Sequence, residues 1–217
     1  MLIGIMTGPG ESSATRILGY GGMQKVPTAK AEIFQCRNFL DAGLCSDLVA
    51  LIEQERRPST LADPNGDAYF RTSETCDLDS NHPAVRSVEA KLDALTGIDP
   101  AYGEPLQGQR YDVGQEFKAH TDFFAPDGED FEKYCSVAGQ RTWTCMIYLS
   151  DVDAGGATRF RELKKTFQPE AGKLLAWNNR TADGGVNEAT LHHGMKVRKG
   201  LKYVLTKWYR EKPWGWE

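Results

Sequence analysis

Two segments in the first half of the chain carry apolar residues at helical spacing. The apolar positions are Cys45, Leu48, Val49 and Ile52 in the first segment, and Val85, Val88, Leu92 and Leu95 in the second. Residues three or four positions apart lie on one face of a helix, so this spacing predicts helices over residues 41–57 and 83–96. Pro83 suits a first helical turn and Gly97 a helix end, which supports the bounds of the second helix.

The second half of the chain consists of short segments rich in aromatic and β-branched residues, which is typical of strands. These segments span residues 107–124, 141–149, 157–160, 173–177, 192–197 and 201–209. Two polar stretches between them, residues 125–140 and 178–189, are predicted to be loops at the mouth of the β structure, where binding residues usually collect. Many short strands after two helices favour a barrel or a sandwich.

One domain is expected to fill the chain, because 217 residues exceed an ordinary domain of about 150 residues only modestly. Residues 1–30 are dense in glycine and proline, which predicts an irregular arm or a short edge strand with little function. Residues 31–100 would then provide helical support, and residues 101–217 the β core.

The charge balance of the chain limits its expected partners. With 26 Lys and Arg against 30 Asp and Glu, the net charge is −4, which argues against general electrostatic binding to nucleic acid or to an anionic membrane. The five cysteines form no C-x-x-C pair, so neither a disulfide framework nor a zinc ribbon is indicated. The first ten residues lack the pattern of a signal peptide, and no apolar run is long enough to span a membrane. We therefore expect a cytoplasmic protein.

Candidate metal ligands lie among the four histidines of the chain. His120 and Asp122 stand at i and i+2, so on a strand both side chains leave the same face and can converge on one cation. His192 or His193, about seventy residues further on, would supply a second imidazole. Two histidines and one carboxylate on one face of an iron leave positions open for substrate and oxygen.

Several stretches, in order along the chain, resemble the prolyl 4-hydroxylase branch of the iron(II)- and 2-oxoglutarate-dependent dioxygenases. They are RTS at residues 71–73, QRYDVGQEFKAHTDFF at 109–124, RTWTCMIYL at 141–149, GGATRF at 155–160 and HHGMKVRKGLKYVLTKW at 192–208. The resemblance covers roughly residues 70 to 210. Several coupled motifs are far more specific than any one of them.

The resemblance also indicates which histidine completes the metal site. The family pattern runs His, one residue, Gly, then a later Gly, one residue and Lys, which corresponds here to His192, Gly194, Gly200 and Lys202. His192 is therefore the expected ligand. His193 points to the opposite face of an ideal strand, so we expect it to pack or to support the site from outside.

The same resemblance implies a binding site for 2-oxoglutarate. Lys202 would pair with the distal carboxylate of this co-substrate, which fits the need of a buried cation for an anion. Tyr148 would support the same carboxylate through its hydroxyl. Tyr111, Thr144 and Thr206 are candidates for additional hydrogen bonds.

Two further residues match positions that meet the prolyl substrate in this family. Trp208 would line the proline pocket, and it shares one strand face with Lys202 by period two. Arg141 would contact the substrate, although it lies seven residues from Tyr148. Both residues can face the site only with a bulge or a strand start at Arg141. Phe117 stands where many members carry a tyrosine, which removes a hydrogen-bond donor and weakens the inference about the substrate.

The fold that the resemblance implies is mainly β with supporting helices, around a double-stranded β-helix or jelly-roll core. The implied cofactors are Fe(II) on His120, Asp122 and His192, with 2-oxoglutarate and O2 as co-substrates and ascorbate as a further candidate. The implied reaction is hydroxylation of prolyl residues in a peptide or protein. Two alternatives stay open: the same chemistry on a small molecule such as a free amino acid, and a non-catalytic binding domain on the same barrel.

Residues 58–68 and 125–140 are predicted to form a mobile lid over the substrate groove, because both segments carry Gly, Pro and Asp between well-patterned elements. The sequence leaves the oligomeric state open.

Overall fold

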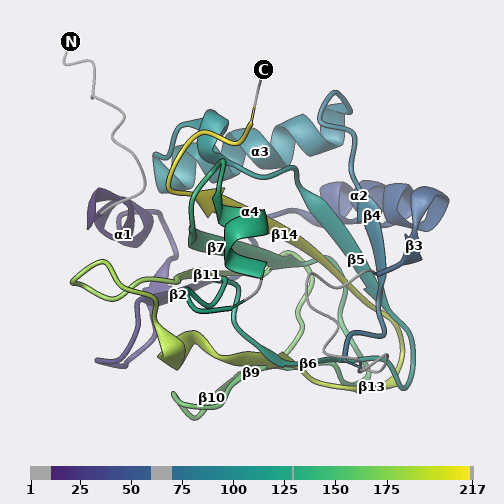
Figure 1. The fold of residues 1–217 in the computed structure, drawn as a ribbon. Helices are drawn as coiled ribbons and strands as arrows, with labels where there is room; N and C mark the ends of the chain where they lie inside the picture. Colours follow the sequence, from purple (N-terminus) through teal and green to yellow (C-terminus); the bar gives the residue numbers. More distant parts are fainter. Residues whose placement is uncertain (1–10, 60–69, 129, 216–217) are drawn as a thin grey trace.

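A computed structural model of the protein describes residues 11–59, 70–128 and 130–215. Its described strands form two main open antiparallel sheets of unequal size and one separate pair of strands rather than a closed barrel, with helices on the outer face of the larger sheet (Figure 1). The expected jelly-roll core with supporting helices is thereby confirmed, with the qualification that no barrel closes among the described strands.

The larger sheet has eight strands. In their order across the sheet they are β1 (Gln24–Lys25), β2 (Ile33–Cys36), β11 (Leu174–Asn178), β7 (Arg141–Tyr148), β14 (Lys202–Arg210), β5 (Gln107–Tyr111), β4 (Glu74–Asp77) and β3 (Arg57–Pro58). The smaller sheet has four strands, β10 (Lys165–Phe167), β9 (Thr158–Phe160), β12 (His192–Gly194) and β6 (Phe117–His120). A separate pair consists of β13 (Val197–Lys199) and β8 (Ala154–Gly155).

The two helices predicted from apolar spacing are present at nearly the expected bounds. Helix α2 (Ala42–Glu55) begins at Asp41, whose side chain accepts a hydrogen bond from the Leu44 backbone N–H at 2.9 Å. Helix α3 (Pro83–Thr96) is capped by His82 and ends at Gly97, whose φ of 66° is the left-handed conformation that favours glycine. In the described ranges, no helix is long and apolar enough to cross a bilayer.

The expectation for residues 1–30 was wrong in part, because helix α1 (Glu11–Leu18) lies within them. Its eight residues contain neither glycine nor proline, so the high average density of these residues over the segment hid a short helix. Ile17 is fully buried in the core beside α3, and Arg16 donates a hydrogen bond to the Ala94 carbonyl. Tertiary packing therefore stabilises a helix too short to be stable alone.

A second difference concerns residues 125–140, which contain the short helix α4 (Asp130–Cys135) instead of loop only. Residues 178–189 are irregular as expected and end in the 3-10 turn η2 (Glu188–Thr190), and another such turn, η1 (Pro100–Tyr102), precedes β5. Most of the other proposed lid segment, residues 60–68, lies outside the described residues. The mobility of the lid stays a prediction.

The predicted strand over residues 107–124 is interrupted by a turn that moves the chain between the two sheets. β5 belongs to the larger sheet and β6 to the smaller one. Gln115 closes the turn by donating its N–H to the Asp112 carbonyl, and Gly114 adopts a φ of 88° within it. The segment 192–197 divides in the same way into β12 and β13. The alternation of apolar and polar residues along a segment does not reveal where the chain passes from one sheet to another.

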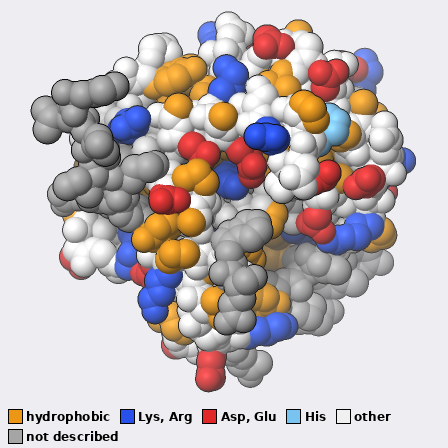
Figure 2. Space-filling view, turned by 90° about the horizontal axis from the view of Figure 1, so that it is seen from above, with side chains coloured by type: hydrophobic (Ala, Val, Ile, Leu, Met, Phe, Trp, Pro, Cys, Tyr) orange, Lys and Arg blue, Asp and Glu red, His pale blue; other side chains and the backbone are white. Residues whose placement is uncertain are grey.

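The larger sheet separates two apolar cores because its strands alternate between faces. On β7, Trp143, Cys145 and Ile147 point to the helices, whereas Met146 and Tyr148 point to the smaller sheet. The surface on the helical side carries acidic and basic side chains interspersed with one another (Figure 2). Several buried polar side chains, among them Asp122, His192 and Lys202, line the space between the two sheets.

Candidate metal centre

A cavity opens between the two sheets and is lined by side chains from both. Its lining consists of Gln109, Tyr111, Phe117, His120, Asp122, Met146, Thr158, Trp177, His192, Gly194, Lys202, Val204, Thr206 and Trp208. The set combines two imidazoles, a carboxylate and an ammonium group with aromatic walls. Four of the lining residues, at positions 202, 204, 206 and 208, occupy every second position of β14 and therefore share one face of the strand. The predicted common face of Lys202 and Trp208 is thus confirmed.

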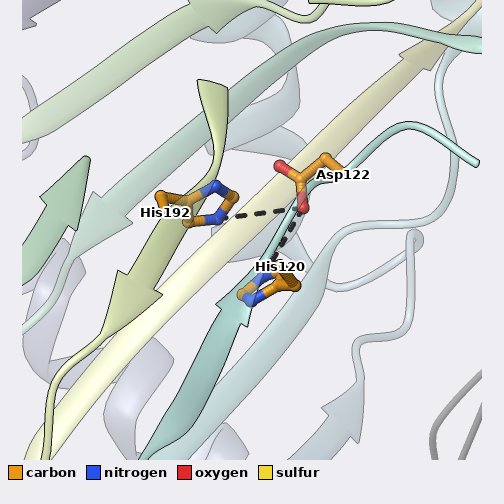
Figure 3. Close-up of side chains that lie close together, drawn as sticks. All are labelled: His120, Asp122 and His192. Atoms are coloured by element: carbon orange, nitrogen blue, oxygen red, sulfur yellow. Dashed lines mark ion pairs between the residues drawn. The ribbon is translucent and has the colours of Figure 1, made fainter. Parts of the chain in front are cut away.

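The three expected metal ligands meet at one point of this cavity (Figure 3). β12 pairs with β6 so that His192 lies directly opposite His120, and Asp122 follows β6 by two residues. The Asp122 Oδ1 atom lies 3.8 Å from Nε2 of His120 and 4.0 Å from Nε2 of His192. Within the described part of the chain, these three side chains are the one group of potential ligand atoms close enough to share a metal ion.

Backbone carbonyl groups orient both imidazoles for metal binding. Nδ1 of His120 lies 2.7 Å from the Lys118 carbonyl oxygen, and Nδ1 of His192 lies 3.0 Å from the Thr190 carbonyl oxygen. A carbonyl oxygen only accepts, so each Nδ1 carries the proton and each Nε2 keeps its lone pair facing Asp122. This is the arrangement by which proteins usually hold histidine ligands.

The charge state of the cluster suits a cation. Burial, and then the neighbouring His192, lower the pKa of His120 to about 3, so its ring is neutral at physiological pH. Burial opposes ionisation of Asp122, but the two imidazoles, Arg141 and the Thr144 hydroxyl outweigh it, and the pKa of this carboxyl is lowered. The cluster thus offers an ionised carboxylate and neutral imidazole, and three ligands leave room for further ones on a metal such as Fe(II).

Aromatic rings hold the histidines in place. Phe117 stacks on His120 with a centroid separation of 3.5 Å and an interplanar angle of 15°. Phe160 and Trp177 pack against His192 at 5.3 Å and 5.0 Å. The phenylalanine that replaces the tyrosine common at position 117 therefore serves as packing for a ligand.

His193 lies outside the metal cluster, as its position in the alternation of β12 predicts. Its Nε2 lies 2.9 Å from the Glu116 carboxylate, which also lies 3.5 Å from Nζ of Lys196. His193 thus belongs to an ion-pair group on the other face of the smaller sheet.

Lys202 is a buried cation without a partner anion in the described structure. Its Nζ lies 4.9 Å from the ring centre of Tyr111 and 5.6 Å from that of Tyr148. Burial lowers its pKa from 10.5 to about 7. A buried ammonium group that faces the cavity without an anion among the described residues has the chemistry to pair with a carboxylate ligand.

Only two of the four further residues proposed to contact the co-substrate line the cavity. Tyr111 and Thr206 line the cavity. Tyr148 does not: its hydroxyl donates to Thr158 at 2.7 Å, so only its ring faces Lys202. Thr144 also lies away from the lining, and it donates a hydrogen bond to Asp122 instead of facing the cavity beside Lys202.

Arg141 and Trp208 form a stacked pair. The Arg141 guanidinium carbon lies 3.9 Å from the Trp208 ring centre, and the indole lines the cavity. Arg141 does not line it, because two of its nitrogens donate to the buried Glu104 carboxylate at 2.6 and 2.8 Å. The expected irregularity at the start of β7 is present, since the β14 register shifts between Tyr209 and Arg210. Arg141 thus reaches the site from behind Trp208.

Sequence reasoning did not single out several residues of this site. Gln109 lines the cavity and shares a strand face with Tyr111, so period two could have identified it. Glu104 lies in the irregular segment before β5, where no pattern exists. Asn179 lies just beyond β11 and reaches the metal site only through a side-chain partner.

Comparisons with known proteins agree with this geometry. The model of the 2OG-Fe(II) oxygenase superfamily matches residues 106–210. The human prolyl 4-hydroxylase subunit alpha-1 is 34% identical over 167 residues, which cover 75% of this chain and 31% of that protein. The probable prolyl 4-hydroxylase 8 of Arabidopsis thaliana is 31% identical over 202 residues, covering 81% of this chain and 67% of that protein.

The fold likewise resembles a solved structure. The viral collagen prolyl hydroxylase of Paramecium bursaria Chlorella virus-1, solved with 2-oxoglutarate, superimposes with a TM-score of 0.65 at 24% identity, covering 82% of this chain and 95% of that chain. This likeness shows the fold. The chain spans about a third of the length of the human subunit. Together with the sequence relatives, the superfamily match shows that the chain belongs to the prolyl 4-hydroxylase family of 2OG-Fe(II) oxygenases, which use Fe(II), 2-oxoglutarate and O2.

Proposed function

We propose that this protein is an Fe(II)- and 2-oxoglutarate-dependent dioxygenase that hydroxylates prolyl residues of a peptide or protein. The observation that carries the proposal is the cavity shared by the His120, Asp122 and His192 cluster, the indole of Trp208 and the ammonium of Lys202, which has no partner anion among the described residues. Each of the three features fits one component of the reaction: the metal, the dicarboxylate and the prolyl ring.

The metal cluster fits Fe(II) by the chemistry of its donors. Two imidazole nitrogens and one carboxylate oxygen on one face are the set that non-haem Fe(II) oxygenases use. When bound, the iron supplies the redox chemistry that couples oxidative decarboxylation of 2-oxoglutarate to insertion of oxygen into a C–H bond. The chain's own contribution is to fix Nε2 of each imidazole and Oδ1 of Asp122 around one point.

The role of Lys202 is to bind and orient the co-substrate. Its ammonium group is buried beside the rings of Tyr111 and Tyr148, so a carboxylate meeting it there forms a poorly screened, charge-assisted hydrogen bond. The ring of Tyr148 is held beside Lys202 by the hydrogen bond of its hydroxyl to Thr158. Lys202 would hold the far carboxylate of 2-oxoglutarate, and the cavity that it shares with the metal cluster would receive the keto-acid end.

The role of Trp208 is to provide a flat apolar surface for a prolyl ring. Arg141 supports the indole from its other side and is itself fixed by Glu104. We propose that the peptide lies over Trp208 and that Arg141 acts chiefly by holding this surface. A small-molecule substrate is the competing possibility, and the experiment below separates the two.

The proposal is tested with purified, Fe(II)-loaded protein, 2-oxoglutarate, O2 and a panel of proline-rich peptides. Succinate is quantified alongside the peptide masses, and Asp122→Ala serves as the control without a metal site. We expect peptide-dependent succinate formation and hydroxylated peptide from the wild type and neither from Asp122→Ala. The Arg141→Ala variant should keep its affinity for 2-oxoglutarate and lose most peptide hydroxylation. If free amino acids and not peptides stimulate succinate formation, the small-molecule alternative holds; if nothing does, the chain is a binding domain.

We further propose a reducing, cytoplasmic setting, which the five free and buried cysteines support. Ascorbate as an accessory reductant rests on family resemblance. The absence of nucleic-acid partners rests on the net charge of −4.

A further inference from the structure

A buried chain of hydrogen bonds ends on the carboxylate of the metal cluster. The Thr144 hydroxyl donates to Oδ2 of Asp122 at 2.7 Å, and Nδ2 of Asn179 donates to the Thr144 oxygen at 2.9 Å. Thr144 and Asn179 are fully buried, and neither lines the cavity. The Thr144 hydroxyl and Nδ2 of Asn179 are therefore directed toward Asp122 and not at solvent or at a substrate, while Oδ1 of Asn179 has no hydrogen-bond partner among the described residues.

The direction of each bond follows from the donors available. An ionised carboxylate only accepts, so the single hydroxyl proton of Thr144 must point at Asp122. The Thr144 oxygen is then free to accept, and the Asn179 amide supplies a proton to it. As long as Asn179 donates, the hydroxyl has no competing acceptor within this chain of bonds.

The backbone fixes Asn179 at the far end of this chain of hydrogen bonds from Asn179 through Thr144 to Asp122, which we call the relay. Its N–H donates to the Thr142 carbonyl at 2.7 Å, and its carbonyl accepts from the Asn187 N–H at 2.9 Å. Thr144 lies on β7 opposite Trp177 of β11, two residues before Asn179. The chain of hydrogen bonds thus starts from two inner strands of the larger sheet, β11 and β7, each paired on both sides.

The two oxygens of Asp122 have separate surroundings as a result. Oδ2 is held by Thr144, whereas Oδ1 is the atom closest to Nε2 of both histidines, at 3.8 and 4.0 Å. Rotation of the carboxylate about its last bond would break the bond to Thr144. The relay therefore favours presentation of Oδ1 alone to a cation.

We propose that Thr144 and Asn179 are positioning residues of the iron site, which hold Asp122 as a ligand through one oxygen. The inference rests on the proposed function for the identity of the metal, but it concerns metal affinity and needs no substrate. It assigns to Thr144 a role different from the co-substrate contact expected from the sequence.

The test measures the dissociation constant of Mn(II), a redox-inert substitute for Fe(II), by equilibrium dialysis of the full chain without peptide. Thr144→Val keeps the shape of the side chain and removes the hydroxyl, so its dissociation constant should rise by about 10- to 100-fold. Thr144→Ser keeps the hydroxyl and should stay within about threefold of the wild type. Asn179→Asp should resemble Thr144→Val, because the hydroxyl then turns to the new carboxylate.

Thr142→Val is the matched control. Thr142 is equally buried on the same strand, but its hydroxyl donates to the Tyr209 carbonyl and not to Asp122. This variant should bind Mn(II) as the wild type does, even if its melting temperature falls. Wild-type affinity in a folded Thr144→Val protein, or equal losses in the Thr142 and Thr144 variants, would overturn the inference. If the wild type itself binds no Mn(II), the proposed function fails instead.

Discussion

Replacement of Lys202 by methionine should separate two effects that the buried ammonium group has on the protein. Lys202 is 2% exposed, and burial lowers its pKa from 10.5 to about 7 because no anion among the described residues compensates its charge. Methionine fills similar space without the charge. We therefore expect the variant to fold more stably than the wild type and to bind 2-oxoglutarate far more weakly.

The magnitudes follow from the burial of the group. Removal of one partner of a buried charge pair costs about 2–5 kcal/mol, or roughly 30- to several-thousand-fold in the dissociation constant of 2-oxoglutarate. The lowered pKa corresponds to a stability cost of at most about 5 kcal/mol in the ligand-free protein. This cost is full below about pH 7, where the folded protein must bury the charge, and fades as the pH rises toward 10, because the unfolded chain then loses its proton too.

Calorimetric titration of 2-oxoglutarate into Mn(II)-loaded protein measures the affinity, and thermal unfolding measures the stability. For the wild type, the dissociation constant should be nearly constant below about pH 7 and rise toward tenfold per pH unit above it, since the carboxylate requires the ammonium form. A Lys202→Met variant with wild-type affinity would refute the role of Lys202. So would a wild-type affinity that does not change between about pH 6 and about pH 8.5.

Two further predictions concern stability. Burial raises the pKa of Asp93 to about 6, so the folded protein favours the neutral carboxyl and loses stability as the pH rises from about 4 to 6. In thermal scans, the Asp93→Asn variant should therefore have a higher melting temperature than the wild type at pH 8. This difference should disappear near pH 4. Gly108→Ala would place a methyl group 2.5 Å from Cγ1 of Ile52 in α2, so urea unfolding should show a loss of about 1–3 kcal/mol. Ile52→Ala, which removes Cγ1 itself, should cost less stability in the Gly108→Ala background than in the wild type. A Gly108→Ala protein as stable as the wild type would show that α2 does not pack closely on β5.

Alternation along strands accounts for most of the site that could be predicted from the sequence. It separated His193 from His192 and placed Lys202 in the same cavity as Trp208, whereas Asp122 lies beyond the end of β6 and is brought to His120 by the loop that follows the strand. The first two relations need only local geometry, because side chains two residues apart on a strand share a face whatever the rest of the fold does.

The remaining features depend on contacts between distant segments. Thr144 lies on the inner face of β7, as period two allows, but its partner Asp122 comes from the loop after β6 in the other sheet. The expected free guanidinium of Arg141 is occupied by Glu104, 37 residues earlier in the chain. Helix α1 was missed because packing of Ile17 stabilises it, not intrinsic preference. None of these partners is implied by any local pattern.

The most direct test of prolyl hydroxylation is tandem mass spectrometry of a proline-rich peptide after reaction with the Fe(II)-loaded protein, 2-oxoglutarate and dioxygen labelled with a heavy oxygen isotope. The proposed function predicts one labelled oxygen on a prolyl ring of the peptide, and no such product from Asp122→Ala. Label found only on other residues or only in free small molecules, or no label at all from a folded protein that binds both iron and 2-oxoglutarate, would contradict it.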